Sequence, residues 1–190
     1  MGKRKRITER LDDIDLFYAQ KNLKRNNIKG DGNCLFRAIA HQLYGDQERH
    51  PEIRKICIVE LHKNWDKYKK LIDKKYEKLK CDEYVSLMSK DRTWAGHAEK
   101  VALKNALELQ IITITPFENS SWIIGDNPSK MIYLSFEDQV HYSSLTTLDP
   151  EKAIDIGEIM DWTRVVDLDP EDQQELKKRR LDVGVEVRLI

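Results

Sequence analysis

The sequence predicts an α+β fold in which helices flank a small mixed or antiparallel sheet. Helical patterns occupy the chain up to residue 109, and β-branched segments follow at 111–115, 122–124 and 131–136. Helices first and strands clustered late favour this class, because the strands can pair into one sheet that the helices cover. The chain has 190 residues, of which 40% are hydrophobic, so it is long enough for one domain with a substantial core.

The helices are predicted from apolar residues that recur every three or four positions. They cover residues 8–25, 34–43, 52–62 with a continuation through 72, 82–88 and 98–109. Pro51 suits the first turn of the third helix, and Asp82 is a good N-cap for the fourth. The first helix would lean on the main domain. The lysine-rich segment up to Lys80 presents a polar face, which is either a solvent-facing surface or a contact surface.

The strands follow the last of these helices directly. That helix has small side chains at Ala98, Ala102 and Ala106, so we expect it to pack closely against the sheet. The β-branched run after it is typical of a buried strand. A turn at 125–128 separates the next two strands, and residues 143–148 can return as another.

The two ends of the chain have patterns of their own. Residues 3–6 are all basic and form either a nuclear signal or a solvated tail. Residues 169–172 resemble a helix start, and the basic run 177–180 suits the end of that helix. Residues 183–189 alternate like a strand, which would either extend the sheet or pair with another molecule.

The composition restricts the compartment and the partners. Thirty-three basic and 33 acidic side chains cancel, so the overall charge does not indicate nucleic acid or an anionic membrane as a partner. No apolar run approaches the roughly 20 residues of a membrane span, and the N-terminus lacks the apolar core of a signal peptide. Three cysteines without a CxxC pair favour a reducing compartment and argue against a zinc site. We expect a cytoplasmic protein, or a nuclear one.

The stretch from Lys29 to Ala40 places one cysteine where a glycine-rich turn becomes an amphipathic helix. The free N–H groups and the dipole at a helix N-terminus stabilise a thiolate relative to the thiol. Gly30 and Gly32 permit a tight turn whose amides could hold an oxyanion beside the sulfur. Cys34 is therefore a candidate nucleophile. The alternative is a small buried cysteine that packs like alanine.

Residues 31–38 read Asp-Gly-Asn-Cys-Leu-Phe-Arg-Ala, which resembles the signature of the ovarian tumour (OTU) family of cysteine deubiquitinases. Further blocks are similar in the same order: Leu43-Tyr44-Gly45-Asp46-Gln47 with His50 and Arg54, then Tyr84 and Met88, then Trp94-Ala95-Gly96-His97-Ala98-Glu99, and finally His141-Tyr142-Ser143-Ser144. Ala95 departs from the family, which has glycine there. The likeness implies a papain-like OTU fold at 26–148, with a basic tail and helix at 1–25 and an extension at 149–190 outside it.

The resemblance implies a thiol hydrolase that needs neither a metal nor an organic cofactor. Cys34 would be the nucleophile and His141 the general base and acid, a role that suits the pKa of histidine. In the architecture of the family, the strand end that carries His141 lies beside the N-terminus of the Cys34 helix. The other histidines are assigned no catalytic role: His41, His50, His62 and His97.

Four residues would support this pair. Gly32 and Asn33, with the amide of the cysteine, would hold the oxyanion. Many family members have Asn or Asp two residues after the histidine, where this chain has Ser143, whose hydroxyl would orient an imidazole more weakly. Asp31 matches the other acidic catalytic position of the family. It either orients the imidazole or hydrogen-bonds its own turn.

The substrate implied by the resemblance is ubiquitin or a polyubiquitin chain, cleaved at the isopeptide bond of its C-terminal glycine. The C-terminal tail of ubiquitin is basic, so Glu137 and Asp138 are candidate contacts, or else ordinary solvated turn acids. Two alternatives stay open. One is a ubiquitin-binding pseudoenzyme of the same fold, which is suggested by Ser143 at a position where many family members have Asn or Asp. The other is a protease for another ubiquitin-like modifier, which the motifs suit equally well. The motifs specify neither a ubiquitin linkage nor an oligomeric state.

Overall fold

The computed structural model of the chain describes residues 13–116, 121–154 and 163–164. The helices are a segment at 13–20, α2 (Cys34–Tyr44), α3 (His50–Lys63), α4 (Trp65–Tyr68), α5 (Cys81–Met88) and α6 (His97–Leu107), with 3-10 turns η1 (Gln47–Arg49), η2 (Lys74–Tyr76) and η3 (Pro128–Lys130). The strands are β1 (Leu23–Asn26), β2 (Gln110–Ile114), β3 (Ser121–Ile124), β4 (Met131–Glu137), β5 (His141–Thr147) and β6 (Thr163–Arg164).

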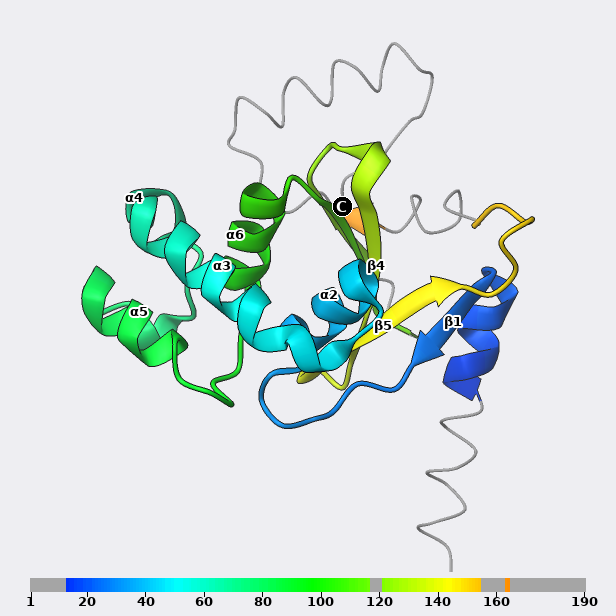
Figure 1. The fold of residues 1–190 in the computed structure, drawn as a ribbon, viewed down its shortest axis with the longest axis horizontal. Coiled ribbons are helices and arrows are strands. Elements are labelled where there is room, and N and C mark those ends of the chain that lie inside the picture. Colours follow the sequence, from blue (N-terminus) through cyan, green and yellow to red (C-terminus); the bar gives the residue numbers. More distant parts are fainter. Residues whose placement is uncertain (1–12, 117–120, 155–162, 165–190) are drawn as a thin grey trace, which may run out of the picture.

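In the described part of the chain the strands form one mixed sheet in the order β1-β5-β4-β2-β3-β6. The β2–β4 and β3–β6 pairs are parallel, and the other three pairs are antiparallel. In Figure 1, α3, α4, α5 and α6 gather on one side, and the 13–20 helix lies beside β1 on the other. The predicted α+β class is confirmed.

The two faces of the sheet are covered by separate hydrophobic cores. Side chains alternate along each strand, so neighbouring residues enter different cores. On β4, Leu134 packs with α2, α3, α5 and α6, whereas Tyr133 packs with the 13–20 helix. The larger core includes Phe36, Ile39, Ile53, Leu61, Tyr84, Leu103, Ile111 and Phe136. The smaller core consists of Ile14, Tyr18, Leu23, Ile112, Ile114, Tyr133 and Leu145.

The first helix ends earlier than the sequence predicts. It stops at residue 20, and Asn22 takes a left-handed conformation with φ of 59°. The Asn22 side chain donates to the Asp149 carbonyl at 3.0 Å and accepts from the Asp149 N–H at 2.9 Å. Residues 23–26, which were expected to end the helix and begin the domain, form the strand β1 on β5. The sheet therefore begins before the predicted domain boundary.

Two helix boundaries also differ from prediction. The third predicted helix breaks at Asn64, and the continuation is only the short α4, whose Trp65 packs against Tyr84 at 5.5 Å between ring centroids. The helix predicted to start after Asp82 starts at Cys81, because the Glu83 carboxylate accepts from the backbone N–H of Lys80 at 2.8 Å. Asp82 lies in the first turn of α5 instead of at its cap.

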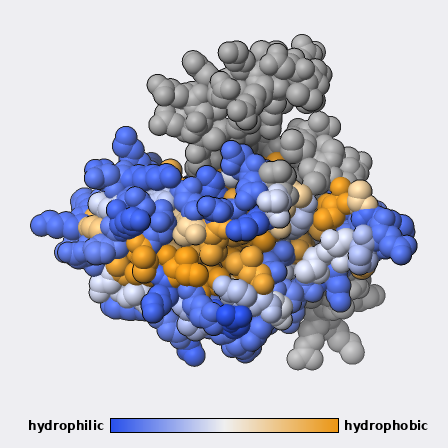
Figure 2. Space-filling model, turned by 45° about the horizontal axis from the view of Figure 1, so that its top comes forward, coloured by the Kyte–Doolittle hydropathy of each residue, from blue (hydrophilic) through white to orange (hydrophobic). Residues whose placement is uncertain are grey.

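The surface carries hydrophobic side chains between hydrophilic ones. Figure 2 shows a hydrophobic patch across the middle of one face, with hydrophilic residues on either side of it. None of the helices in the described ranges combines the length and apolar character needed to cross a bilayer. The predictions for residues 3–6, 169–180 and 183–189 fall outside the described residues.

Candidate active site

The nucleophile turn, residues 29–33, fits against a supporting loop at residues 89–96. Gly32 has a φ of +85°, and a Cβ on it would lie 2.1 Å from the carbonyl oxygen of Arg92. A side chain cannot occupy that space unless one of the two segments moves. This close approach fixes the turn relative to the supporting loop, and with it the start of α2.

The side chain of Asn33 joins the same two segments. Its Oδ1 accepts from Arg54 Nη2 at 2.6 Å and from the N–H of Arg92 at 3.0 Å, and its Nδ2 donates to Asp91 Oδ1 at 3.0 Å. Its backbone N–H donates to Asp31 Oδ1 at 3.1 Å. Asn33 was predicted to help hold an oxyanion. Its polar groups are instead used to hold the turn in place.

Arg54, on α3, is the centre of this support, and sequence reasoning assigned it no role. It is 5% exposed, and its guanidinium donates to the carbonyl oxygens of Met88 at 2.7 Å and Thr93 at 2.9 Å in addition to Asn33. Its Cζ lies 4.2 Å from the centroid of the Phe36 ring. An arginine in a charged helix usually faces solvent, so periodicity alone gives no signal of this position. Its place in an OTU-like block was the available signal.

Asp31 is bound by Arg37. The guanidinium Nη2 lies 2.7 Å from Oδ2, and Nε lies 3.1 Å from both carboxylate oxygens. These hydrogen bonds hold the pKa of the Asp31 carboxyl well below its usual range. No hydrogen bond joins Asp31 to His141 in the described structure. Of the two roles considered for Asp31, its contacts correspond to holding the turn.

Cys34 is the first residue of α2 and is 3% exposed. The backbone amides of Tyr142, Leu35 and Cys34 itself lower the pKa of the Cys34 thiol and so favour the thiolate, as amides at a helix N-terminus should. Burial has the larger effect and raises the pKa of the Cys34 thiol above its ordinary value. The sequence predicted that this position favours the thiolate. The backbone amides do so, but burial outweighs them, and the pKa of the thiol is raised overall.

His141 is the first residue of β5 and lies against the nucleophile turn. A Cβ on Gly30 would be 3.7 Å from His141 Nδ1. The next residue, Tyr142, supplies one of the amides at the Cys34 sulfur. The strand β5 lies between β1 and β4, so His141 stands at the end of an internal strand. Within the described residues no hydrogen bond joins Cys34 Sγ to the imidazole.

Polar side chains from α2 set how this helix lies on the sheet. Gln42 Nε2 donates to the carbonyl oxygen of Tyr133 at 2.9 Å and also to that of Leu145. His41 Nδ1 lies 2.9 Å from Ser144 Oγ. Both contacts reach β5 or its neighbour β4. They therefore fix the placement of the helix N-terminus relative to the start of β5.

The turn that precedes His141 is held by Trp94 of the supporting loop. The indole Nε1 donates to the carbonyl oxygen of Val140 at 2.8 Å, and the ring stacks on Tyr142 with 6.3 Å between centroids. The supporting loop therefore contacts both halves of the site. It holds the nucleophile turn at one end and the histidine strand at the other.

Of the remaining predicted site residues, Ser143 is buried, Glu137 is bonded inside the domain and Asp138 is exposed. Ser143 is buried two residues after His141, and no hydrogen bond joins the two side chains in the described part. Glu137 lies opposite His141 in the β4–β5 pair, and its carboxylate accepts from Arg25 at 2.7 Å and from Ser135 at 2.7 Å. These contacts hold the carboxylate inside the domain, and its contact with a substrate stays a prediction.

Asp138, in contrast, is exposed in the β4–β5 turn, with a φ of 49°. Aspartate adopts this left-handed conformation more readily than most residues. Asp138 is thus an exposed residue close in sequence to the histidine.

The fold and the site together define a cysteine protease of α+β architecture. The chain belongs to the OTU-like cysteine protease family, whose model matches residues 29–148. It is similar to OVARIAN TUMOR DOMAIN-containing deubiquitinating enzyme 11 of Arabidopsis thaliana, with 32% identity over 131 residues that cover 67% of this chain and 51% of that protein. The chain spans about a third to a half of the lengths of this and two further Arabidopsis thaliana relatives, whose covered shares are 33% and 36%.

Solved structures agree with this assignment. The OTU domain of OTUD1 matches with a TM-score of 0.63 and 28% identity, over 72% of this chain and 93% of that one. An OTU domain solved in complex with ubiquitin matches with a TM-score of 0.55 and 18% identity, over 85% and 88% of the two chains. The second likeness supports the fold alone.

Gly32→Ala should misplace the nucleophile turn. The new methyl group meets the Arg92 carbonyl, so we expect labelling of Cys34 by an electrophilic ubiquitin probe to fall at least about tenfold. Gly45→Ala is the matched control, because Gly45 also has a positive φ (+72°) but open space around its Cβ position. That variant should lose only about 1–2 kcal/mol of stability and keep its labelling rate. Equal labelling by both variants would show that the close approach does not matter.

The raised pKa of Cys34 predicts slow alkylation of the free protein at neutral pH. The folded state keeps the thiol proton to higher pH, so iodoacetamide modification of Cys34, followed by peptide mass spectrometry, should still be rising at the ordinary thiol pKa of 9.0. His141→Gln should leave this profile unchanged, because no hydrogen bond joins the two groups. A plateau below about pH 7 that disappears in His141→Gln would instead reveal a thiolate–imidazolium pair in the free protein.

Proposed function

We propose that the chain is a thiol-dependent deubiquitinase that hydrolyses the isopeptide bond at the C-terminal glycine of ubiquitin. The observation that carries the proposal is the meeting of two distant segments. Cys34 begins α2 and the backbone amide of Tyr142 lowers the pKa of its thiol, while His141, the residue before Tyr142, packs against Gly30 of the nucleophile turn. A nucleophile and a base held this close are what acyl transfer to a thiol needs.

In the proposed reaction the Cys34 thiol attacks the glycine carbonyl while His141 accepts the thiol proton. The carbonyl becomes a tetrahedral oxyanion, which the N–H groups of Gly32 and Cys34 would stabilise; the N–H of Asn33 is bonded to Asp31. When the C–N bond breaks, the imidazolium returns the proton to the leaving lysine amine. Water, deprotonated by the same imidazole, then hydrolyses the thioester and restores the thiol.

The burial of Cys34 fits a reaction in which substrate binding activates the nucleophile. The raised pKa keeps the sulfur protonated in the free protein, which limits its reaction with other electrophiles. Hydrogen bonds between catalytic groups are often long in a free enzyme and shorten when the substrate is bound. A thin peptide tail that ends in glycine is suited to a cysteine that is only 3% exposed.

The similar proteins support ubiquitin as the substrate. The Arabidopsis thaliana relative is named as a deubiquitinating enzyme, and one structural neighbour was solved with ubiquitin bound. A ubiquitin-binding pseudoenzyme is the second candidate. It is favoured by the observation that neither Ser143 nor Asp31 orients His141 through a hydrogen bond in the described structure.

An electrophilic ubiquitin probe and a panel of defined ubiquitin dimers test the proposal. We expect the wild-type chain to form a probe adduct and to cleave at least one dimer. Cys34→Ala should abolish both activities, and His141→Gln should reduce dimer cleavage at least about 100-fold. Cys57→Ser and Cys81→Ser are the controls and should keep the probe adduct. Tight ubiquitin binding without an adduct would identify the pseudoenzyme, and cleavage by Cys34→Ala would end the assignment.

We also propose that Asp138 contacts the basic tail of ubiquitin. Its exposed position in the turn before the histidine strand supports this role. Asp138→Asn keeps the left-handed backbone accessible and removes the charge, so the KM for the cleaved dimer should rise about two- to fivefold at low salt with little change in kcat. Asp126→Asn, an exposed acid in another turn, should change neither. An unchanged KM in Asp138→Asn would remove Asp138 from the binding surface.

A further inference from the structure

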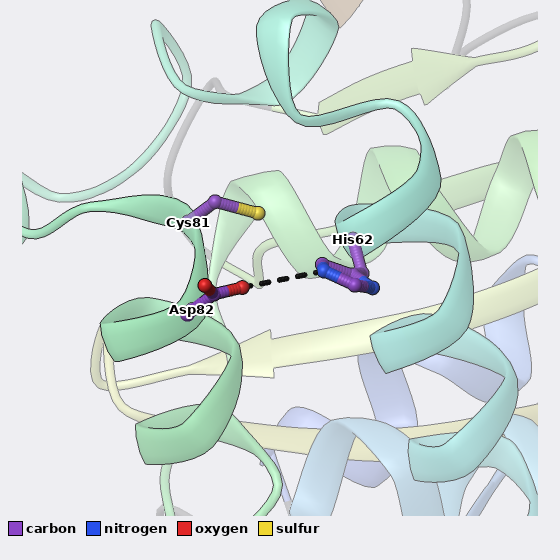
Figure 3. A group of neighbouring side chains, drawn as sticks. All are labelled: His62, Cys81 and Asp82. Atoms are coloured by element: carbon purple, nitrogen blue, oxygen red, sulfur yellow. Dashed lines mark ion pairs between the residues drawn. The ribbon is translucent and has the colours of Figure 1, made fainter.

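A second group of reactive side chains lies where α3 ends and α5 begins. His62 is near the C-terminus of α3, and Cys81 and Asp82 are the first two residues of α5. Figure 3 shows that the three side chains point toward one another across the gap between the helices. One donor atom from each, a ring nitrogen, a sulfur and a carboxylate oxygen, lies within 4.8 Å of the others. The cysteine protease site uses none of them.

The spacing of these donors matches a tetrahedral metal site. His62 Nε2 and Asp82 Oδ1 are 3.3 Å apart. Two ligands bound to zinc at the usual Zn–N and Zn–O lengths of roughly 2.0–2.2 Å, with a tetrahedral angle between them, are separated by about 3.3 Å. The sulfur, which forms a longer bond, is within reach of the same point. The nitrogen, oxygen and thiolate set is one that zinc accepts readily.

The charges around the group also suit a cation. The carboxylate of Asp82 acts electrostatically on the Cys81 thiol; that of Asp66 does so too, although it is paired with Lys69 Nζ at 2.6 Å. The side chains of His62 and Asp82 are 61% and 92% exposed, so an ion and a water molecule can reach them without any movement of the core. One thiolate and one carboxylate together balance the two positive charges of a divalent ion.

We propose that His62, Cys81 and Asp82 form a binding site for Zn²⁺ or a chemically similar divalent ion, with water as the fourth ligand. On binding, the neutral His62 ring gives its Nε2 lone pair to the metal and keeps its proton on Nδ1. The Cys81 thiol releases one proton to solvent as the S–metal bond forms. Asp82 contributes one carboxylate oxygen. Nothing is oxidised or reduced.

The ion would tie together the two ends of the segment at 64–80. That segment carries α4 and η2, whose Trp65 and Tyr76 pack against Tyr84 of α5. The far end of α5 supplies the Met88 carbonyl that binds Arg54. Metal binding would therefore stabilise the helix that leads into the supporting loop. The spacing of residues in the sequence does not predict this site, because its ligands come from two helices and include no CxxC pair.

Cobalt and zinc binding to the Cys34→Ser protein tests the proposal without any use of enzyme activity. This background removes the catalytic thiol, so Cys81 is the accessible thiol and Cys57 is fully buried. We expect one equivalent of Co²⁺ to produce a thiolate-to-cobalt charge-transfer band that Zn²⁺ displaces. Zn²⁺ at about 100 times its Kd should raise the Tm by roughly 5 °C or more relative to the protein in EDTA.

Variants of the three ligands provide the decisive comparison. Adding Cys81→Ser should abolish the charge-transfer band, and adding His62→Gln or Asp82→Asn should weaken Co²⁺ binding at least about tenfold. Asp126→Asn should bind like the parent. Because the changed side chains are largely outside the core, each variant should melt in EDTA like the parent. A charge-transfer band that survives Cys81→Ser, or a Zn²⁺ effect on Tm that survives Asp82→Asn, would overturn the proposal, as would the absence of saturable binding.

Discussion

The contact between the nucleophile turn and the supporting loop is the constraint on which the rest of the site depends. There is no room for a side chain on Gly32 beside the Arg92 carbonyl. The side-chain amide of Asn33 hydrogen-bonds to Arg54, Asp91 and Arg92. Buried polar groups that are hydrogen-bonded to several segments favour one geometry, because an alternative leaves further donors or acceptors without a partner. The position of Cys34 is therefore determined by its neighbours before any substrate binds.

The same architecture favours the protonated thiol of Cys34 in the free protein. Amides at the start of α2 and on β5 favour a thiolate, but burial raises the pKa of the Cys34 thiol by a larger amount. The imidazole of His141 lies next to the turn without a hydrogen bond to the sulfur. This arrangement is consistent with a site in which the substrate completes the catalytic geometry, and in which the supporting loop keeps both halves in position through Trp94 and Asn33.

Some of this could be predicted from the sequence, and the rest depends on contacts between distant residues. The α+β class, the strand at 131–136 and the candidates Cys34 and His141 follow from local periodicity and from short motifs. The strand β1 does not, since Leu-Lys-Arg-Asn has little strand character and becomes a strand only by pairing with β5. Arg54 and the Glu137–Arg25 pair were missed for a related reason, because a charged residue gives no local sign of the partner that buries it. The net pKa of Cys34 was mispredicted because burial is a property of the whole fold.

Cys34 and His141 are proposed to act on the same carbonyl group. A crystal structure of the chain after reaction with an electrophilic ubiquitin probe tests it most directly. The account predicts a covalent bond from Cys34 Sγ to the modified C-terminus of ubiquitin, with the His141 ring within hydrogen-bonding distance of the sulfur or of the attached group. An adduct on Cys81, or a Cys34 adduct with the His141 ring turned away beyond that distance, would contradict it.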